Sequence, residues 1–350
     1  MKLESVAVSF PSRKLTNDDI VTLIEEESKS TFEGNLNKAL RQISLLLGYT
    51  GANERHWLDK GEDRMDYIVD SVKKALKDGD CNKKDIDLLI YAGVDRRLRG
   101  LGDAILVAKA VGMKNIQCFD ILDACMSWTT AVEAAYALLN NQGYKHIMVV
   151  SAEFNQTREN GPAYPAIFRL RNLEQLEWTF PGFTVGEAAT ATILSHYPGS
   201  KWEFSFSTRS DLADLCTIPL PGYESYCALS DKIGRNGPYR FTSFGREMYE
   251  YGKPEAVNVF RELSKKVPIE DIKAIFPHTS SKRDWDTGAK EVGVEKLLYN
   301  IYPEYGNVVS ASVPAGMALA IQEGRIKRGD RIAGWVASAG MSFAAYSFIY

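Results

Sequence analysis

The stretch Ile116-Gln117-Cys118-Phe119-Asp120-Ile121-Leu122-Asp123-Ala124-Cys125-Met126-Ser127-Trp128-Thr129-Thr130-Ala131 contains three predicted elements in a row. Residues 116–121 form a strand-length apolar run, and residues 127–141 repeat apolar positions at helical spacing. The turn between them presents Cys125, near the unsatisfied N–H groups and the positive dipole end of a helix, which lowers a thiol pKa. The stretch therefore predicts a strand–turn–helix unit with a reactive cysteine, and a buried, inert cysteine is the alternative.

Further apolar runs of strand length surround this unit. Residues 88–92 and 146–150 predict buried strands, and residues 101–112 and 127–141 predict helices between them. Strands that alternate with helices at this density indicate an α/β layered fold.

The second half of the chain repeats this order. Residues 85–90 resemble residues 271–276, an offset of 186 (271 less 85), and alignment of His146 with Arg331 gives 185 (331 less 146). The agreement predicts two duplicated halves, residues 1–198 and 199–350, joined near residues 196–202. Cys125 then lies opposite Ser310, so both halves contribute to one central pocket, a favoured place for a ligand.

Composition excludes several classes of function. The 350 residues are 45% hydrophobic and 25% charged, as in globular proteins, and a formal net charge of -3 gives no broad basic face for nucleic acid. The five cysteines are odd in number and lack CxxC spacing, so neither a disulfide framework nor a zinc site is expected. No GxGxxG or GxxxxGK[ST] motif indicates a nucleotide cofactor, and we expect none.

The two chain ends predict a cytoplasmic protein without a membrane partner. No apolar run follows Lys2, so the first residues do not predict a signal peptide. The last 19 residues, 332–350, carry no charge, but Gly334, Gly340 and three serines favour two buried strands over a membrane span.

Two further elements can carry chemistry. The apolar run 274–277 delivers His278 at its carboxyl end, where open α/β sheets place ligands, whereas His56, His146 and His196 predict structural or surface roles. Asn307 follows a glycine and precedes a helix of small residues, so it offers amide donors at that point. Taken alone, His278 would be interpreted as an ordinary core histidine and Asn307 as an ordinary turn residue.

Together, the three elements resemble the thiolase superfamily, and within it the type III β-ketoacyl-acyl-carrier-protein synthases, over essentially the whole chain. The motifs that carry the resemblance occur in family order: Asp-x-x-x-Ala-Cys ending at Cys125, Pro-His-Thr-Ser-Ser from Pro277, Gly-Asn-x-x-Ser-Ala-Ser-x-Pro from Gly306, the closing segment 324–330, and Thr50-Gly51.

The resemblance implies a five-layered αβαβα fold of two duplicated halves, a buried site and a homodimer. It implies that Cys125, His278 and Asn307 form a catalytic triad, with the backbone N–H groups of Cys125 and Ala339 as oxyanion hole. Ala339 stands where glycine is usual in the family.

The resemblance also implies the reaction, that of an acyltransferase acting in fatty-acid or related biosynthesis. Cys125 takes an acyl group from a thioester of acyl carrier protein or coenzyme A. A malonyl-type thioester then loses carbon dioxide, and its enolate, held by His278 and Asn307, attacks the acyl-cysteine to give a β-ketoacyl product.

Departures from the family pattern concern the substrate. Thr279, Ser280 and Ser281 replace the usual Gln-Ala-Asn, and Leu45 and Tyr49 stand where members that use coenzyme A present Trp and Arg. These changes favour a carrier-bound primer and a specialised pathway of secondary metabolism, such as polyketide synthesis.

Three arginines are candidates for substrate or carrier binding. Arg283 matches a basic position at the family's tunnel mouth, and Arg97 lies in the arginine-rich segment 95–101, which is otherwise a solvated face. Arg158 lies in segment 154–185, which is longer than its family counterpart and predicts a lid, with a variable surface insertion as the alternative.

Two other functions remain open within the fold. One is an acyltransferase that moves the acyl group from Cys125 to an alcohol, an amine or a preformed β-keto nucleophile. The other is a non-catalytic partner subunit, which the retained cysteine and histidine disfavour. A thiolase is disfavoured because Ser338 stands where its second cysteine is expected.

Overall fold

The computed structural model describes the chain except residues 99, 142, 157–160, 226 and 228–229. Its first sheet has the strand order β1-β7-β6-β4-β5, in which β4 is parallel to β5 and β6, and β7 is antiparallel to β1 and β6. The strands are β1 (Lys2–Ser9), β4 (Leu88–Ala92), β5 (Gln117–Ile121), β6 (His146–Glu153) and β7 (Ala188–Ser195). Every residue of β4 and β7 is buried, as expected for strands covered on both faces.

The second sheet has the order β11-β12-β13-β8, with β11 and β12 parallel and the other pairs antiparallel. Its strands are β8 (Glu203–Thr208), β11 (Ile272–Pro277), β12 (Arg331–Ser338) and β13 (Ser342–Ile349). The uncharged C-terminal stretch therefore forms two buried strands, as predicted. Among the described residues, no helix has the length and apolar character that crossing a membrane requires.

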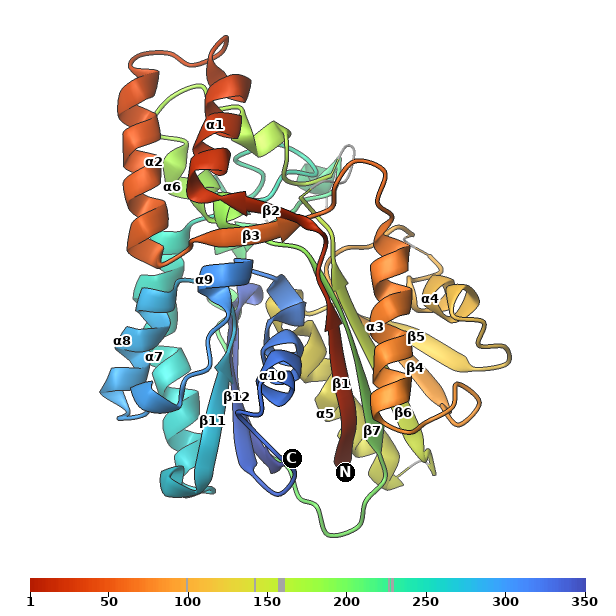
Figure 1. Cartoon of the computed structure of the whole chain (residues 1–350). Coiled ribbons are helices and arrows are strands. Elements are labelled where there is room, and N and C mark those ends of the chain that lie inside the picture. The colour runs from red at the N-terminus through yellow and green to blue at the C-terminus, as the bar shows by residue number, and fades with distance from the viewer. Residues whose placement is uncertain (99, 142, 157–160, 226, 228–229) are drawn as a thin grey trace.

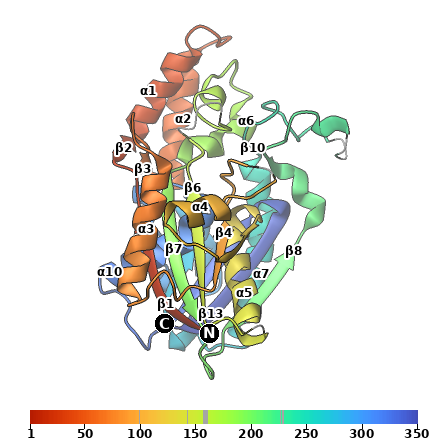
Figure 2. The ribbon, with the colours of Figure 1, turned by 90° about the vertical axis from the view of Figure 1, so that its right-hand side faces the viewer.

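Helices cover both sheets and fill the space between them (Figures 1 and 2). Residues of α5 (Ser127–Asn141) and α10 (Ser312–Gln322) share one core with strands of both sheets. On the far face of the first sheet lie α3 (Arg64–Asp78) and α4 (Ala104–Ala110), and α7 (Gly245–Ser264) and α8 (Lys282–Glu291) cover the far face of the second. This stacking confirms the predicted αβαβα layers.

The two halves repeat each other in the predicted register. β6 and β12 begin at residues 146 and 331, and α5 and α10 begin at residues 127 and 312, so both pairs are 185 residues apart. A short 3₁₀ turn precedes each of these two helices, and each turn begins with a residue in the left-handed region, Ala124 at φ 45° and Val309 at φ 50°. The division of the chain at residue 198 stays a prediction.

A cap lies above the carboxyl ends of the inner strands (Figure 1). It contains α1 (Asn17–Ser28), α2 (Leu36–Thr50), α6 (Leu176–Thr179), β2 (Arg13–Thr16) and β3 (Glu54–Trp57). The described part of segment 154–185 packs into this cap, because Phe168 is fully buried against Trp57 and its carbonyl accepts a hydrogen bond from the Ser28 hydroxyl at 3.0 Å. That part is therefore a packed element and not an irregular surface insertion.

The remaining elements are short and lie around the cap and the ends of the sheets. They are β9 (Cys216–Thr217), β10 (Thr242–Ser243), α9 (Tyr302–Tyr305) and the 3₁₀ turns Ala124–Met126, Ala166–Phe168, Phe180–Thr184, Ser210–Leu215, Tyr223–Ser225, Ile269–Asp271, Glu295–Leu297, Val309–Ala311 and Ala339–Met341.

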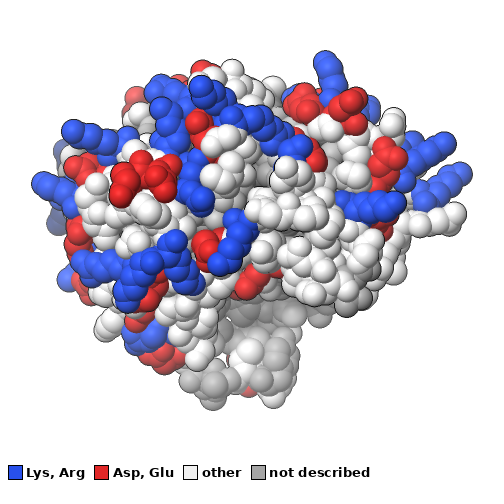
Figure 3. All heavy atoms as spheres, turned by 90° about the horizontal axis from the view of Figure 1, so that it is seen from below, with Lys and Arg blue, Asp and Glu red and all other residues white. Residues whose placement is uncertain are grey.

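Charge is mixed on the face of the molecule that Figure 3 shows. Lys and Arg side chains there are interspersed with Asp and Glu and with uncharged surface. This mixture of charges agrees with a formal net charge of -3 for the chain.

Candidate active site

A single cavity of about 1170 Å³ brings the predicted residues together. Cys125, His278, Asn307 and Ala339 all line it, although they come from four separate segments of the chain. Its volume slightly exceeds the roughly 300–1,000 Å³ of ordinary small-molecule pockets, so it can hold an extended ligand.

The Cys125 turn is fixed by hydrogen bonds on both sides of the cysteine. Asp123 accepts a hydrogen bond on Oδ2 from Thr130 at 2.7 Å, and its N–H donates to the Ser127 hydroxyl at 2.8 Å. The Met126 N–H donates to Ser338 Oγ at 3.2 Å, which joins this turn to the end of β12 in the other half. The thiol therefore sits at the start of α5 in a turn that both halves hold.

The expectation of a lowered thiol pKa is wrong. Burial raises the pKa of Cys125 well above its usual value, and the electrostatic effects of Cys216 and Glu153 act in the same direction. The backbone N–H groups of Ala339 and of Cys125 itself lower the pKa, but burial outweighs them. Cys125 is therefore a neutral thiol at neutral pH, and it must lose its proton as it attacks.

His278 is an almost fully buried imidazole directly after β11. Its backbone N–H donates to the Trp335 carbonyl at 2.9 Å, and its side chain is 2% exposed. Burial lowers the pKa of His278 to about 4, and within the described part of the chain its Nδ1 has no hydrogen-bond partner. At neutral pH the group is an uncharged imidazole that can donate one N–H or accept a proton.

Asn307 is held with its side-chain amide in a defined orientation. Its N–H donates to the Thr184 carbonyl at 2.8 Å, and its Oδ1 accepts from the Val309 N–H at 2.9 Å. Because the oxygen is engaged in this turn, the NH₂ group is the part that remains for a ligand. The preceding Gly306 has φ 68°, and a Cβ there would lie 2.4 Å from the Thr184 carbonyl oxygen, so this approach requires glycine.

The residues that depart from the family pattern after His278 have structural contacts. Thr279 Oγ1 accepts from the Val308 N–H at 3.0 Å and lies 2.7 Å from Ser312 Oγ, so it ties the His278 segment to the Asn307 turn. Ser280 Oγ accepts from Trp285 Nε1 at 2.8 Å, and Ser281 caps α8.

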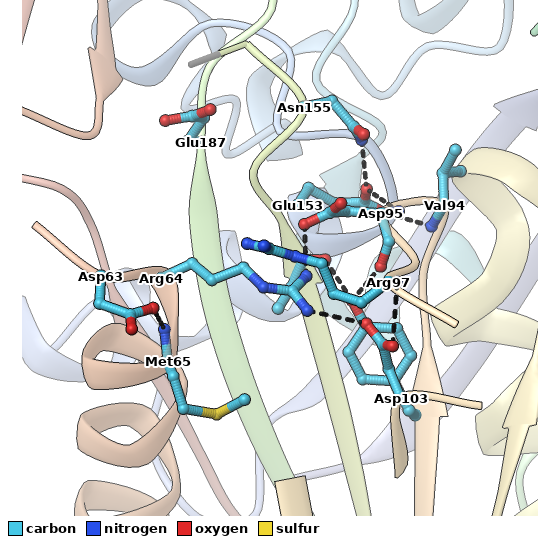
Figure 4. Close-up of polar contacts among 12 residues, drawn as sticks. Asp63, Arg64, Met65, Val94, Asp95, Arg97, Asp103, Glu153, Asn155 and Glu187 are labelled. Carbon is cyan, nitrogen blue, oxygen red and sulfur yellow. Dashed lines mark hydrogen bonds and ion pairs between the residues drawn. The ribbon is translucent and has the colours of Figure 1, made fainter. Parts of the chain in front are cut away.

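Sequence reasoning missed Glu153, a carboxyl group buried beside the site at the end of β6 (Figure 4). It accepts hydrogen bonds from the N–H groups of Val94 and Asp95, at 3.0 and 3.2 Å, from the Asn155 amide at 3.1 Å, and from the Ser310 hydroxyl. Burial raises the pKa of Glu153 to about 7, although the hydrogen bonds from Ser310 and Val94 lower it. The pairing with Ser310 connects the first sheet to the turn that mirrors the Cys125 turn.

A buried ion network next to Glu153 holds the segment that follows β4 (Figure 4). Arg64 on α3 binds Asp95 at 2.6 Å and Asp103 at 3.0 Å, and all three side chains are at most 4% exposed. Since Val94 lines the cavity beside this network, Arg64 fixes part of the cavity wall.

The three arginines that were predicted to bind substrate or carrier lie in different surroundings. The Arg283 guanidinium lies 3.8 Å from the ring centroid of Tyr49, a cavity-lining residue that is 55% exposed, so Arg283 is at the cavity mouth. Arg97 is exposed, and its backbone N–H donates to Asp103 at 3.0 Å. Arg158 lies outside the described residues. A role for any of them in binding stays a prediction.

Within the part of the chain that the structure describes, no three or more His, Cys, Asp or Glu residues gather in a group that could hold a metal ion.

Comparisons with known proteins agree with this fold. The family model of the 3-oxoacyl-[acyl-carrier-protein] synthase III C terminal matches residues 264–349. The chain is 26% identical over 288 residues to the β-ketoacyl-[acyl-carrier-protein] synthase III of Fusobacterium nucleatum, covering 81% of this chain and 83% of the relative. The Aquifex aeolicus relative of the same name is 23% identical over 356 residues, covering 100% and 99%.

Solved structures share the fold. Xanthomonas campestris OleA with bound lauric acid and lauroyl-CoA superposes with a TM-score of 0.82 at 18% identity, covering 99% of this chain and 98% of that one. The 3-oxoacyl-[acyl-carrier-protein] synthase III of A. aeolicus gives 0.79 at 20% identity, covering 100% and 99%. The layered architecture and these similarities identify the chain as a β-ketoacyl-acyl-carrier-protein synthase III-like member of the thiolase superfamily, and so as an enzyme of the acyltransferase class.

Proposed function

We propose that the enzyme takes an acyl group from a thioester onto Cys125 and condenses it with a malonyl-type thioester to give a β-ketoacyl product. The observation that carries this proposal is the convergence of Cys125, His278 and Asn307 on one cavity from three separate segments. Acyl transfer and Claisen condensation are the general chemistry of this family, and the assignment of roles to these residues is our proposal.

In the first step the Cys125 sulfur attacks the thioester carbonyl. The N–H groups of Cys125 and Ala339 already interact with this sulfur, so they are placed to stabilise the oxyanion that forms on the carbonyl oxygen when the sulfur attacks the adjacent carbon. Because the thiol is neutral at rest, its proton moves as the bond forms, and the uncharged His278 imidazole can accept it. The bond between the acyl carbon and the donor sulfur then breaks, and the donor leaves as a free thiol that takes this proton from His278.

In the second step the malonyl-type thioester loses carbon dioxide and leaves an enolate. The enolate carbon bonds to the acyl carbon, and the Cys125 sulfur leaves as a thiolate that takes up a proton. A His278 N–H and the Asn307 NH₂ group donate hydrogen bonds to the enolate oxygen. Both donors are uncharged and held before the substrate arrives, and loss of one such donor typically lowers the rate by about 10²–10³.

We also propose that the acyl donor is bound to a carrier protein and that the enzyme serves a specialised pathway. Leu45 and Tyr49 are 74% and 55% exposed on α2, and Tyr49 lines the cavity, so the Trp and Arg of members that use coenzyme A are replaced here by exposed Leu and Tyr. Arg283 over Tyr49 gives the cavity mouth a positive charge for an acidic carrier.

The active form is proposed to be a homodimer that pairs through β5. In the described residues β5 pairs with β4 alone, so its other edge is open. Phe119 in this strand and Leu122 directly after it are 36% and 62% exposed, and Leu122 also lines the cavity. A second copy paired along this strand would cover the apolar surface and close the cavity beside Cys125.

The condensation step is tested with a malonyl carrier-protein thioester after the enzyme has been loaded with an acyl group. We expect carbon dioxide release and a product whose mass equals that of the β-ketoacyl thioester, and a loss of about 10²-fold or more in rate for His278→Ala and for Asn307→Ala. Transfer of the acyl group to an alcohol or amine without carbon dioxide release would refute condensation and establish the alternative acyltransferase.

A further inference from the structure

The turn that carries Asn307 is held by a neighbouring segment, residues 183–187. The Asn307 N–H donates to the Thr184 carbonyl at 2.8 Å, and the Gly186 N–H donates to the Asn307 carbonyl at 2.9 Å, in a parallel β-bridge. A Cβ at Gly186 would lie 2.1 Å from the Tyr305 carbonyl oxygen, so the two segments approach each other as closely as glycine allows. The position of the Asn307 backbone therefore follows the position of residues 183–187.

Strand β3 of the cap holds this segment in turn. Trp57 Nε1 donates to the Val185 carbonyl at 2.9 Å, and the Glu187 N–H donates to the His56 carbonyl at 2.8 Å. Trp57 is buried, so its hydrogen bond is shielded from water. Two consecutive residues of β3 thus anchor the later part of residues 183–187.

Arg55, the residue before them on β3, anchors the start of the segment. Its Nη2 donates to the Phe183 carbonyl at 3.3 Å, and its Nη1 donates to Asn17 Oδ1 at 2.9 Å. A Cβ at Gly306 would lie 3.1 Å from Arg55 Cβ, so the stem of this arginine also packs against the residue before Asn307. Arg55 therefore contacts both the anchoring segment and the Asn307 turn.

Stability does not explain why this position holds an arginine. Arg55 is fully buried, and in the described part of the chain no acidic side chain forms an ion pair with it and its Nε has no hydrogen-bond partner. Burial lowers the pKa of Arg55 to about 10, so the group still carries its charge at neutral pH. A buried charge without an opposite charge is costly, and a hydrophobic side chain of similar volume is often at least as stable. A hydrophobic side chain, however, cannot donate to Asn17 and Phe183 at the same time.

We propose that Arg55 is a positioning residue for the condensation step, which holds residues 183–187, and through them the Asn307 amide, at the place where the enolate oxygen forms. This inference rests on the proposed role of Asn307 in the second step. Arg55 does not line the cavity, so it acts through Asn307 and not by contact with the substrate. The loading of Cys125, which uses other donors, does not depend on these contacts.

The first test measures the two half-reactions separately in Arg55→Met. Intact mass after rapid quenching gives the rate at which acetyl or decanoyl pantetheine loads Cys125, and carbon dioxide release from malonyl pantetheine by the loaded protein gives the rate of the second step. We expect carbon dioxide release to fall by roughly 10- to 100-fold, in kcat more than in KM, because a small displacement of a catalytic group has an effect of this size. Loading should change by less than about twofold. Arg55→Lys, which keeps the charge and one donor group, should recover part of the loss.

Arg328→Met is the matched control. The Arg328 guanidinium also donates to two backbone carbonyls, those of Leu3 and Glu4, at the end of the molecule opposite the cap (Figure 1). This variant should leave the ratio of the two rates unchanged. An equal loss in both half-reactions of Arg55→Met, or an unchanged rate of carbon dioxide release, would overturn the proposal.

Trp57→Phe provides a second variant if thermal unfolding shows that Arg55→Met is not folded. It keeps an aromatic ring in the core and removes only the hydrogen bond to the Val185 carbonyl. Carbon dioxide release should again fall while loading is kept, and a loss in loading alone would overturn the proposal.

Hydrogen exchange tests the positioning without any substrate. In Arg55→Met the backbone N–H groups of residues 184–187 and 307–309 should exchange about tenfold faster than in the wild-type protein, because local opening of these segments becomes easier. Exchange at the wild-type rate in both segments would overturn the proposal.

Asn307→Ala separates this inference from the proposed function. Carbon dioxide release at the wild-type rate in Asn307→Ala would refute the proposed role of Asn307, whatever Arg55 does. A slow Asn307→Ala together with a fast Arg55→Met would refute positioning by Arg55 alone.

Discussion

Replacement of the buried Glu153 by glutamine should change how the stability of the protein depends on pH. Burial raises the pKa of Glu153 to about 7 in the folded protein, from 4.5 in the unfolded chain. The folded state then holds this proton more tightly, so the stability that the group contributes is present below pH 4.5 and is lost as the pH rises to 7. A shift of roughly 2.5 units at 1.36 kcal/mol per unit corresponds to about 3 kcal/mol.

The assay is urea unfolding of the wild-type protein and of Glu153→Gln at several pH values from 4.5 to 8. Glutamine stays neutral, so the stability of the variant relative to wild type should rise by about 3 kcal/mol over this range. The hydrogen bonds that the variant loses at Glu153 change its free energy of unfolding by an amount that does not depend on pH. A difference that stays constant from pH 4.5 to 8 would refute the reasoning. Ser310→Ala, which removes a hydrogen bond that lowers this pKa, should move the transition to higher pH.

Three other predictions concern the ion network, the thiol and the open strand edge. Arg64→Met removes the guanidinium that binds the buried carboxylates of Asp95 and Asp103 and should lower the free energy of unfolding by about 3–5 kcal/mol, with partial recovery when both become Asn; a loss below about 1 kcal/mol in urea unfolding would contradict this. Alkylation of Cys125 by iodoacetamide should keep accelerating with pH through pH 9, because its pKa is raised, whereas a plateau near pH 7 would show a stabilised thiolate. Phe119→Lys should convert the proposed dimer to a monomer in sedimentation, and an unchanged mass would exclude β5 as the interface.

The sequence pattern was sufficient to predict the layers of the fold and the meeting of Cys125, His278 and Asn307 at one cavity. Buried parallel strands require apolar runs, so β4, β6 and β12 were visible as such, and the 185-residue register placed Cys125 opposite Ser310. His278 follows the end of a strand and Asn307 lies in a tight turn. Both features can be recognised in the local sequence, as an apolar run before His278 and a glycine before Asn307.

What the sequence could not show depends on burial and on contacts between distant segments. The position of Cys125 at a helix start predicted a lowered thiol pKa. In the structure, atoms from both halves bury the thiol, and this burial raises its pKa by more than the backbone N–H groups lower it. Glu153 and Arg64 looked like ordinary charged residues because their partners, Ser310 and Asp103, are brought to them only by the fold.

The replacement of the family's Gln-Ala-Asn after His278 gave no local sign of its contacts either. Thr279 holds the turn around Asn307, and Ser280 holds a tryptophan of α8. Val308, the partner of Thr279, lies on another segment of the chain, and Trp285 lies five residues after Ser280 on α8. The sequence alone showed these substitutions only as departures from the family pattern.

The most direct test of the central claim is the intact mass of the protein after exposure to acyl carrier-protein and acyl-coenzyme A thioesters, followed by peptide mapping. The account predicts one acyl increment, located on the peptide that contains Cys125 and absent from Cys125→Ala. An increment that persists in Cys125→Ala, or no increment from any donor of either class, would contradict it.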